Sequence, residues 1–157
     1  MDRFDRAILS ELERDGRLGF SELATRVGLS KTPCWKRVQA LERAGVIQGY
    51  RAQLNPVALG VGLQAFVQVT THFDKHGEFE AALADQPAVL ACYTIAGDGD
   101  YLLHVMADGV AGLDTLLREE LCQLPGVQRF STTVCLTTIK ENGLLSSLSP
   151  PRSGQRP

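Results

Sequence analysis

The chain has 157 residues, of which 44% are hydrophobic and 22% charged, and its formal net charge is -2. This length allows one ordinary domain or two small ones, and the composition is typical of a soluble globular protein rather than a disordered or fibrous one. No apolar run approaches the length of a bilayer span, and no signal-peptide pattern stands at the N-terminus. We therefore expect a cytoplasmic protein that does not bind a membrane.

The charges are unevenly distributed along the chain. Residues 1–50 hold nine Lys and Arg against seven Asp and Glu, a net charge of +2, whereas the remaining residues hold seven against eleven, a net charge of -4. A basic N-terminal part attached to an acidic remainder is expected when one module faces phosphate groups and the other does not.

The sequence lacks the motifs of common catalytic and metal sites. It has no G-x-S-x-G, no P-loop and no H-E-x-x-H, so we expect neither an enzyme nor a bound metal or cofactor. His72 and His76 lack a further ligand that would complete a metal site. The four cysteines are widely spaced and contain no Cys-x-x-Cys pair, which predicts that they are small core hydrophobes.

Three short helices are predicted in the first 50 residues. Asp2 and Asp5 form a capping-box-like pair at the start of the first helix, which Asp15-Gly16 ends. The second helix is expected over Phe20–Val27, followed by a turn at Gly28.

Ser30 is the predicted N-cap of the third helix. Pro33 lies within its first turn, where a missing N–H costs little, and Gly45 ends it. Apolar residues recur at helical spacing on one side of this helix (Cys34, Val38 and Leu41).

Two helices joined by a tight turn, the second with cations and small polar groups near its start, form a helix-turn-helix, which can enter the major groove of DNA. We expect Ser30, Lys31 and Thr32 to reach base edges, and Lys36 and Arg37 to hold phosphates. The alternative is the solvated face of an ordinary surface helix. The predicted DNA-binding residues are Ser30, Lys31, Thr32, Pro33, Lys36 and Arg37.

The pattern changes after a turn signal at Asn55-Pro56. The order β-α-β-β-α-β that follows is that of a ferredoxin-like sandwich, with two helices on one face of an antiparallel sheet. The expected strands are residues 46–54, 63–71, 89–96, 101–106 and 127–139, and the expected helices are residues 78–84 and 110–124.

The predicted fold is therefore α+β, with a three-helix, winged-type helix-turn-helix followed by a ferredoxin-like domain. We assign residues 1–50 to the DNA-binding domain, 51–61 to a linker strand and turn, 62–145 to an effector-binding and oligomerisation domain, and 146–157 to a flexible tail. A sheet covered on one face leaves an apolar surface, here predicted to hold Phe66, Cys92 and Val105 or their alternating neighbours. Burying that surface against a second copy predicts a homodimer and two DNA half-sites.

Over nearly all of residues 2–145 the sequence resembles the Lrp/AsnC family, the leucine-responsive regulators of transcription in bacteria and archaea. The matching stretches are DRFDRAILSEL with DGR, ELATRVGLSKTPCWKRVQALERAGVIQGY, LNPVALG, GDGDYLLHV, LPGV and STTVCLTTIK. The resemblance implies an N-terminal helix-turn-helix, a C-terminal amino-acid-binding domain of the β-α-β-β-α-β type, and dimers that often assemble into octamers.

The resemblance also implies a site for a small effector between subunits, usually an amino acid, in which turn N–H groups and hydroxyls hold a carboxylate and an aspartate neutralises an ammonium. A plain hairpin turn is the alternative for the GDGDY stretch, because Gly and Asp favour turns for backbone reasons. The family often has a larger residue at the position of Gly99. The implied effector residues are Gly97, Asp98, Asp100, Tyr101, Ser131, Thr133, Val134 and Cys135.

The leading hypothesis is a sequence-specific transcriptional regulator on a pseudo-palindromic operator in the nucleoid, modulated by a small amino acid. One alternative is an architectural, nucleoid-type DNA-binding protein with little effector response. Another is a metabolite-binding or enzyme-associated protein that has lost DNA binding. The TPCWKR and GVGLQAF stretches look closest to the branch that senses cysteine or other small amino acids, and leucine remains open.

Overall fold

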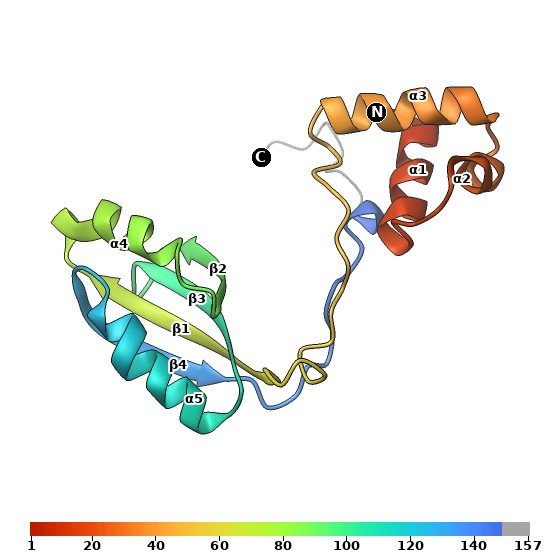
Figure 1. Ribbon diagram of the computed structural model, residues 1–157. Coiled ribbons are helices and arrows are strands. Elements are labelled where there is room, and N and C mark those ends of the chain that lie inside the picture. Colours follow the sequence, from red (N-terminus) through yellow and green to blue (C-terminus); the bar gives the residue numbers. More distant parts are fainter. Residues whose placement is uncertain (149–157) are drawn as a thin grey trace, which may run out of the picture. The chain divides into compact units, whose positions relative to one another are not determined.

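The computed structural model describes residues 1–148 and contains two compact units. One unit comprises Met1–Gln53 together with residues 140–148, and the other comprises Leu54–Ile139. The chain thus passes from one unit to the other twice (Figure 1). No helix in the described part of the chain is long and apolar enough to cross a membrane.

The first unit is built on three helices, α1 (Arg3–Arg14), α2 (Phe20–Val27) and α3 (Lys31–Arg43), as the sequence predicts. The predicted capping box is confirmed: Asp2 accepts the Phe4 and Asp5 N–H groups, and Asp5 accepts the Asp2 N–H. Gly28 ends α2 in the left-handed region, at φ 72°. The buried core of the unit consists of Ile8, Leu23, Ala24, Val27, Cys34, Val38 and Leu41.

The strand predicted over residues 46–54 is wrong for the single chain, because this segment has no regular structure until a turn begins at Pro56. A strand needs a neighbour for its backbone hydrogen bonds, and none in the described chain pairs with it. The segment instead packs through Tyr50, whose ring lies against Gly16 and whose hydroxyl donates to Glu42 Oε1 at 3.0 Å.

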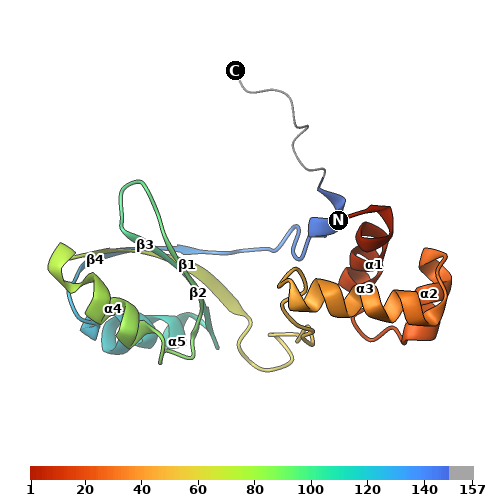
Figure 2. The same ribbon diagram turned by 90° about the horizontal axis from the view of Figure 1, so that it is seen from above.

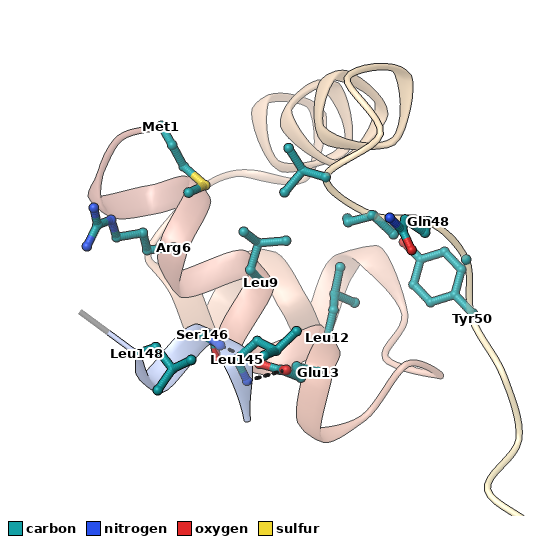
Figure 3. A pocket seen from close by; sticks show the side chains of 13 residues that line it. Met1, Arg6, Leu9, Leu12, Glu13, Gln48, Tyr50, Leu145, Ser146 and Leu148 are labelled. Carbon is teal, nitrogen blue, oxygen red and sulfur yellow. Dashed lines mark hydrogen bonds between the residues drawn. The ribbon is translucent and has the colours of Figure 1, made fainter. Parts of the chain in front are cut away.

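The chain after the second unit returns to helix α1. The Glu13 carboxylate accepts the backbone N–H groups of Leu145 at 2.6 Å and Ser146 at 2.8 Å, which caps a short 3-10 turn over Leu145–Ser147. Figure 3 shows these bonds beside a hollow of about 630 Å³ between α1, residues 46–50 and this segment. The flexible tail predicted over 146–157 is thus ordered at residues 146–148, and its remainder lies outside the described residues.

The second unit is a four-stranded antiparallel sheet in the order β2-β3-β1-β4, with helices on one face, as the ferredoxin-like prediction requires. Figure 2 shows α4 and α5 on the same side of the sheet. The strands are β1 (Leu63–Thr71), β2 (Val89–Thr94), β3 (Tyr101–Ala107) and β4 (Val127–Val134), and the helices are α4 (His76–Leu83) and α5 (Val110–Thr115).

The predicted helix over 110–124 is present but irregular: α5 continues as a π-helical turn over Leu116–Glu120 and a 3-10 turn over Leu121–Gln123. The last strand is shorter than predicted. It pairs only with β1, and the pairing ends where Cys135 N–H donates to the Gln64 carbonyl, since β1 begins at Leu63.

Alternating residues of the strands face α4 and α5 and form the core with Phe79, Leu83, Leu113, Leu116 and Leu121. Within the second unit, no described helix covers the opposite face, which we call the uncovered face. Of the three residues predicted there, Phe66 lies on it, stacked on His104 with ring centroids 5.1 Å apart. The prediction is wrong for Val105, which is fully buried under the helices.

The prediction is also wrong for Cys92, which pairs with the core residue Leu103 and so lies on the helix side of the edge strand β2. The alternating neighbours of Val105, which are His104 and Met106, share the uncovered face with Phe66 and with Leu102. The prediction that all four cysteines are core residues is correct only for the buried Cys34, since Cys92 is exposed and Cys122 and Cys135 are partly exposed.

Candidate functional site

The first turns of α3 form the exposed side of the helix-turn-helix. Ser30 occupies the N-cap position with extended backbone, but its hydroxyl makes no capping bond and is free for another partner. The helix buries Cys34, Val38 and Leu41 against the core, so the intervening residues point outward. The structure brings five of the six predicted DNA-binding residues together on this exposed surface: Ser30, Lys31, Thr32, Pro33 and Lys36.

The two lysines of α3 carry positive charge that no carboxylate neutralises within residues 1–148. Lys31 stands at the first position of the helix and Lys36 lies further along it, both exposed. Trp35 is 46% exposed beside them, which gives this surface a flat apolar element. An exposed helix start with unpaired cations and hydroxyls suits phosphate oxygens and base edges.

Arg37 differs from the other five predicted residues. Its Nη1 atom lies 2.7 Å from Asp2 Oδ2 and 2.8 Å from Asp5 Oδ1, so its charge is held by the first turn of α1. The hydrogen bonds that Arg37 donates to Asp5 and to Asp2 raise the pKa of Arg37 above its ordinary value. Local sequence patterns do not indicate this contact, because the partners lie more than thirty positions apart.

The predicted effector loop, residues 97–100, connects β2 and β3 and rises from the sheet on the side away from α4 and α5 (Figure 2). The Asp100 carboxylate is already engaged, since Oδ2 accepts the Thr71 N–H at 2.8 Å. The Asp98 side chain is exposed and accepts no hydrogen bond from the rest of the described chain. The two aspartates therefore differ: Asp100 fixes the loop, and Asp98 is available to a ligand.

Gly99 lies against β1. A Cβ atom added at this position would stand 2.7 Å from Gln68 Cγ and 3.1 Å from the Val69 carbonyl oxygen. Gly97, by contrast, has nothing within 4 Å of an added Cβ. The loop thus rests on the uncovered sheet face through Gly99, and this contact explains the small residue there.

Sequence reasoning missed Arg129 of β4. Its Nη2 atom donates to the Asp98 carbonyl oxygen at 3.1 Å, which places a guanidinium beside the loop. It was missed because Arg129 lies 31 positions from Asp98 in the sequence, and only the register between β1 and β4 brings the two together. The Arg129 guanidinium and the exposed Asp98 side chain thus belong to the same loop region, and a cation with a carboxylate matches the two charged ends of an amino acid.

Tyr101 is a core residue rather than a loop ligand. It is 2% exposed and packs against Phe79 with ring centroids 4.7 Å apart. Its hydroxyl donates to Glu80 Oε1 at 2.8 Å, at the edge of a separate hollow that also contains Cys92 and Thr94. Burial and this hydrogen bond to Glu80 raise the pKa of Tyr101 to about 12.

The four predicted residues of the last strand lie at increasing distances from the loop within one chain. Ser131 pairs with Gln68 near the loop, but Cys135 lies four positions further along, roughly 13 Å at the rise of a strand. Ser131 and Thr133 are on the uncovered sheet face, whereas Val134 pairs with the core residue Ala65. One chain therefore does not close a pocket around all eight predicted effector residues.

Comparisons with known proteins identify both units. Residues 1–48 match the winged helix-turn-helix DNA-binding family, and residues 64–145 match the Lrp/AsnC ligand-binding domain. The leucine-responsive regulatory protein of Salmonella typhimurium is 43% identical over 148 residues, covering 92% of this chain and 90% of that protein, and that of Escherichia coli K12 is 42% identical with the same coverage. The chain belongs to the Lrp/AsnC family.

Solved structures agree with this assignment. A transcriptional regulator from Neisseria meningitidis in complex with L-methionine superposes with a TM-score of 0.89 at 35% identity, covering 92% of this chain and 96% of that one. The feast or famine regulatory protein from M. tuberculosis, also complexed with L-methionine, gives a TM-score of 0.82 at 38% identity, covering 89% and 95%. This Lrp/AsnC protein is thus a transcriptional regulator with a winged helix-turn-helix DNA-binding domain and a ligand-binding domain.

Proposed function

We propose that this Lrp/AsnC protein binds a pseudo-palindromic operator through two copies of α3 and responds to one or a few small amino acids. The observation that carries the proposal is the first part of α3, where Ser30, Lys31, Thr32, Pro33 and Lys36 lie exposed together and both lysines lack carboxylate partners in the described chain. In this proposal Ser30, Lys31 and Thr32 reach base edges and Lys36 holds a phosphate. The protein works in the cytoplasm, on the nucleoid, without catalysis.

The effector in this proposal is held by charge at the 97–100 loop. Asp98 neutralises the ammonium group and Arg129 binds the carboxylate, while Asp100 and Gly99 keep the loop against β1. Cysteine and leucine are candidates, and L-methionine joins them because two of the similar structures contain it.

A homodimer is part of this proposal, because it would serve both DNA binding and effector binding. The uncovered sheet face carries Phe66, His104, Leu102 and Met106, which a second copy would bury. Two-fold symmetry would pair two recognition helices with two half-sites. Because one chain leaves Thr133 and Cys135 far from the loop, these residues reach an effector only when it binds between subunits. Four such dimers would form an octamer.

The test is fluorescence-anisotropy binding to the DNA upstream of this protein's own gene, with each of the twenty amino acids added in turn. We expect specific, salt-dependent binding whose affinity one or a few amino acids change. Tight binding that no amino acid changes would favour the architectural alternative. Absence of specific binding would contradict the regulatory proposal.

The loop assignment has its own test. Asp98→Asn removes the charge that meets the ammonium group, so we expect the effector concentration at half-response to rise about tenfold or more. The matched control is Glu119→Gln, which neutralises an exposed acidic residue on the helical side of the same unit. An unchanged response in Asp98→Asn would remove Asp98 from the site.

A further inference from the structure

The first turn of α1 and the middle of α3 are joined by a network in which every carboxylate oxygen of Asp2 and Asp5 accepts a hydrogen bond. Asp2 uses Oδ1 to cap the helix, accepting the Phe4 N–H at 2.8 Å and the Asp5 N–H at 3.0 Å, and uses Oδ2 to bind Arg37. Asp5 uses Oδ2 to accept the Asp2 N–H at 2.9 Å and uses Oδ1 to bind Arg37. The capping box and the ion pairs are therefore one structure.

The ring of Phe4 adds an apolar wall to this network. The Arg37 guanidinium carbon lies 5.5 Å from the ring centroid, within the range of a cation–π contact, and Arg3 lies 4.7 Å from the same ring. The Asp5 side chain is only 18% exposed and that of Arg37 33%. The arginine is thus held by two carboxylates and a ring face, and its head group is partly withdrawn from solvent.

Charge makes Arg37 a poor phosphate ligand in this setting. The two carboxylates more than neutralise the Arg37 guanidinium, and with Arg3 over the same Phe4 ring the group is neutral, so Arg37 offers a DNA phosphate little net attraction. Lys31 and Lys36 on the same helix have no such partners within the described residues, and their charges remain available.

We propose that Arg37 is a positioning residue, which fixes the direction of α3 against the N-terminus of α1 and does not itself bind DNA. The inference rests on the proposed function, in which α3 is the recognition helix. Because α3 reads DNA with its first residues, a small rotation of the helix about its packed core would displace Ser30, Lys31 and Thr32 together. Arg37 lies more than one turn further along α3, and its ion pairs with Asp2 and Asp5 at the start of α1 resist that rotation.

Neutralising the carboxylates separates this role from phosphate binding. In the Asp2→Asn, Asp5→Asn double variant, each amide keeps an oxygen that can cap α1, since Asn is as good an N-cap as Asp, but the charges that hold Arg37 are gone. A positioning role predicts that DNA affinity falls about fivefold to tenfold in this variant. If Arg37 were a phosphate ligand, releasing it and removing two negative charges would strengthen binding instead, which would overturn the inference.

The salt dependence of binding gives a second readout. Lys36→Gln should lower the magnitude of the slope of log affinity against log salt by about 1, as expected for the loss of one phosphate contact. Arg37→Gln should weaken binding about as much as the carboxylate double variant while leaving the slope unchanged. In the triple variant the losses should not add, because both changes break the same contact.

All measurements use the full chain and a duplex from upstream of its own gene, at a temperature well below the melting temperature of each variant. If Arg37→Gln lowers the melting temperature but binds DNA as tightly as the parent, Arg37 only stabilises the fold, and the positioning role is overturned. A slope that falls by about 1 in Arg37→Gln would also overturn it. If the parent itself binds DNA without salt dependence, the proposed function fails rather than this inference.

Discussion

Gly97 and Gly99 are two positions apart in the same loop, yet the structure constrains them differently. Both have backbone angles that other residues adopt, so neither is required by a left-handed conformation. Only Gly99 meets a neighbour, with Gln68 Cγ at 2.7 Å and the Val69 carbonyl oxygen at 3.1 Å from an added Cβ. The side chain of Gln68 can move away, but the Val69 carbonyl belongs to a paired strand and cannot easily do so.

We therefore expect Gly99→Ala to destabilise the second unit by about 1–2 kcal/mol, the usual cost of a side chain forced into a packed site. Gly97→Ala is the matched control and should be close to neutral, because its Cβ enters open space. Urea unfolding of both variants measures the difference. Equal stabilities for the two variants would mean that the loop does not rest on β1 in solution.

Some contacts in the candidate site could not be predicted from local sequence patterns, whereas others could. The helical spacing of Cys34, Val38 and Leu41 is local and correctly predicts which side of α3 faces outward. The contact of Arg37 with Asp2 and Asp5 is set by tertiary packing, and so is the position of Arg129 beside Asp98. A lone arginine in a helix or strand carries no local sign of the partner it will meet.

At the scale of elements, those whose ends have local chemical signals were predicted best. The boundaries of α2 and β1 agree residue for residue with the prediction, since Gly19 and Gly28 flank α2 and Gly62 precedes β1. The failures are strands that lack a neighbour: residues 46–54 stay irregular, and β4 ends at Val134 because β1 has no further residues to pair with. Sequence alternation indicates that a segment can form a strand, but pairing decides whether it does.

The uncovered face of the sheet supplies a prediction about assembly. Phe66 lies in the middle of β1, with His104 and Thr133 as its neighbours on the two adjacent strands. We expect Phe66→Glu to prevent the proposed dimer from forming, because both copies of the charge would be buried in its interface. Light scattering coupled to size-exclusion chromatography measures the mass.

The control for this prediction is Val110→Glu, which places the same charge on an exposed apolar residue at the start of α5, on the helical side of the sheet. This variant should assemble as the parent does. If Phe66→Glu also remains dimeric while its fold is intact, the uncovered face is not the interface.

On the scale of the whole molecule, the main feature is that the chain contributes to the first unit from both ends. The helix-turn-helix and the segment after β4 belong to one compact unit, and the Glu13 carboxylate joins them by accepting two backbone N–H groups. The predicted boundaries at residues 50, 61 and 145 describe a linear order of domains. Sequence reasoning offered no basis for this return, because the residues that meet are more than 130 positions apart.

The attachment at Glu13 depends on its charge and therefore on pH. The pKa of Glu13 lies below its ordinary value of 4.5. The main cause is the Ser146 hydroxyl beside the carboxylate, followed by the backbone N–H groups of Ser146 and Leu145. A carboxylate with a lowered pKa in the folded state stabilises that state above its unfolded pKa. This contribution is lost as the pH falls through the folded value. The Leu145–Ser147 turn should thus be held at neutral pH and released in acid.

Glu13→Gln tests this directly, because it keeps one acceptor oxygen and removes the charge. We expect amide hydrogen exchange at residues 144–148 to be faster in the variant than in the parent at neutral pH, since opening of this segment becomes easier. After correction for intrinsic exchange, the difference should shrink as the pH falls below 4.5 and Glu13 of the parent becomes protonated. Glu11→Gln is the control, because Glu11 binds Arg14 and Arg26 and not the returning segment. Equal exchange in the parent and Glu13→Gln at neutral pH would show that Glu13 does not hold the segment.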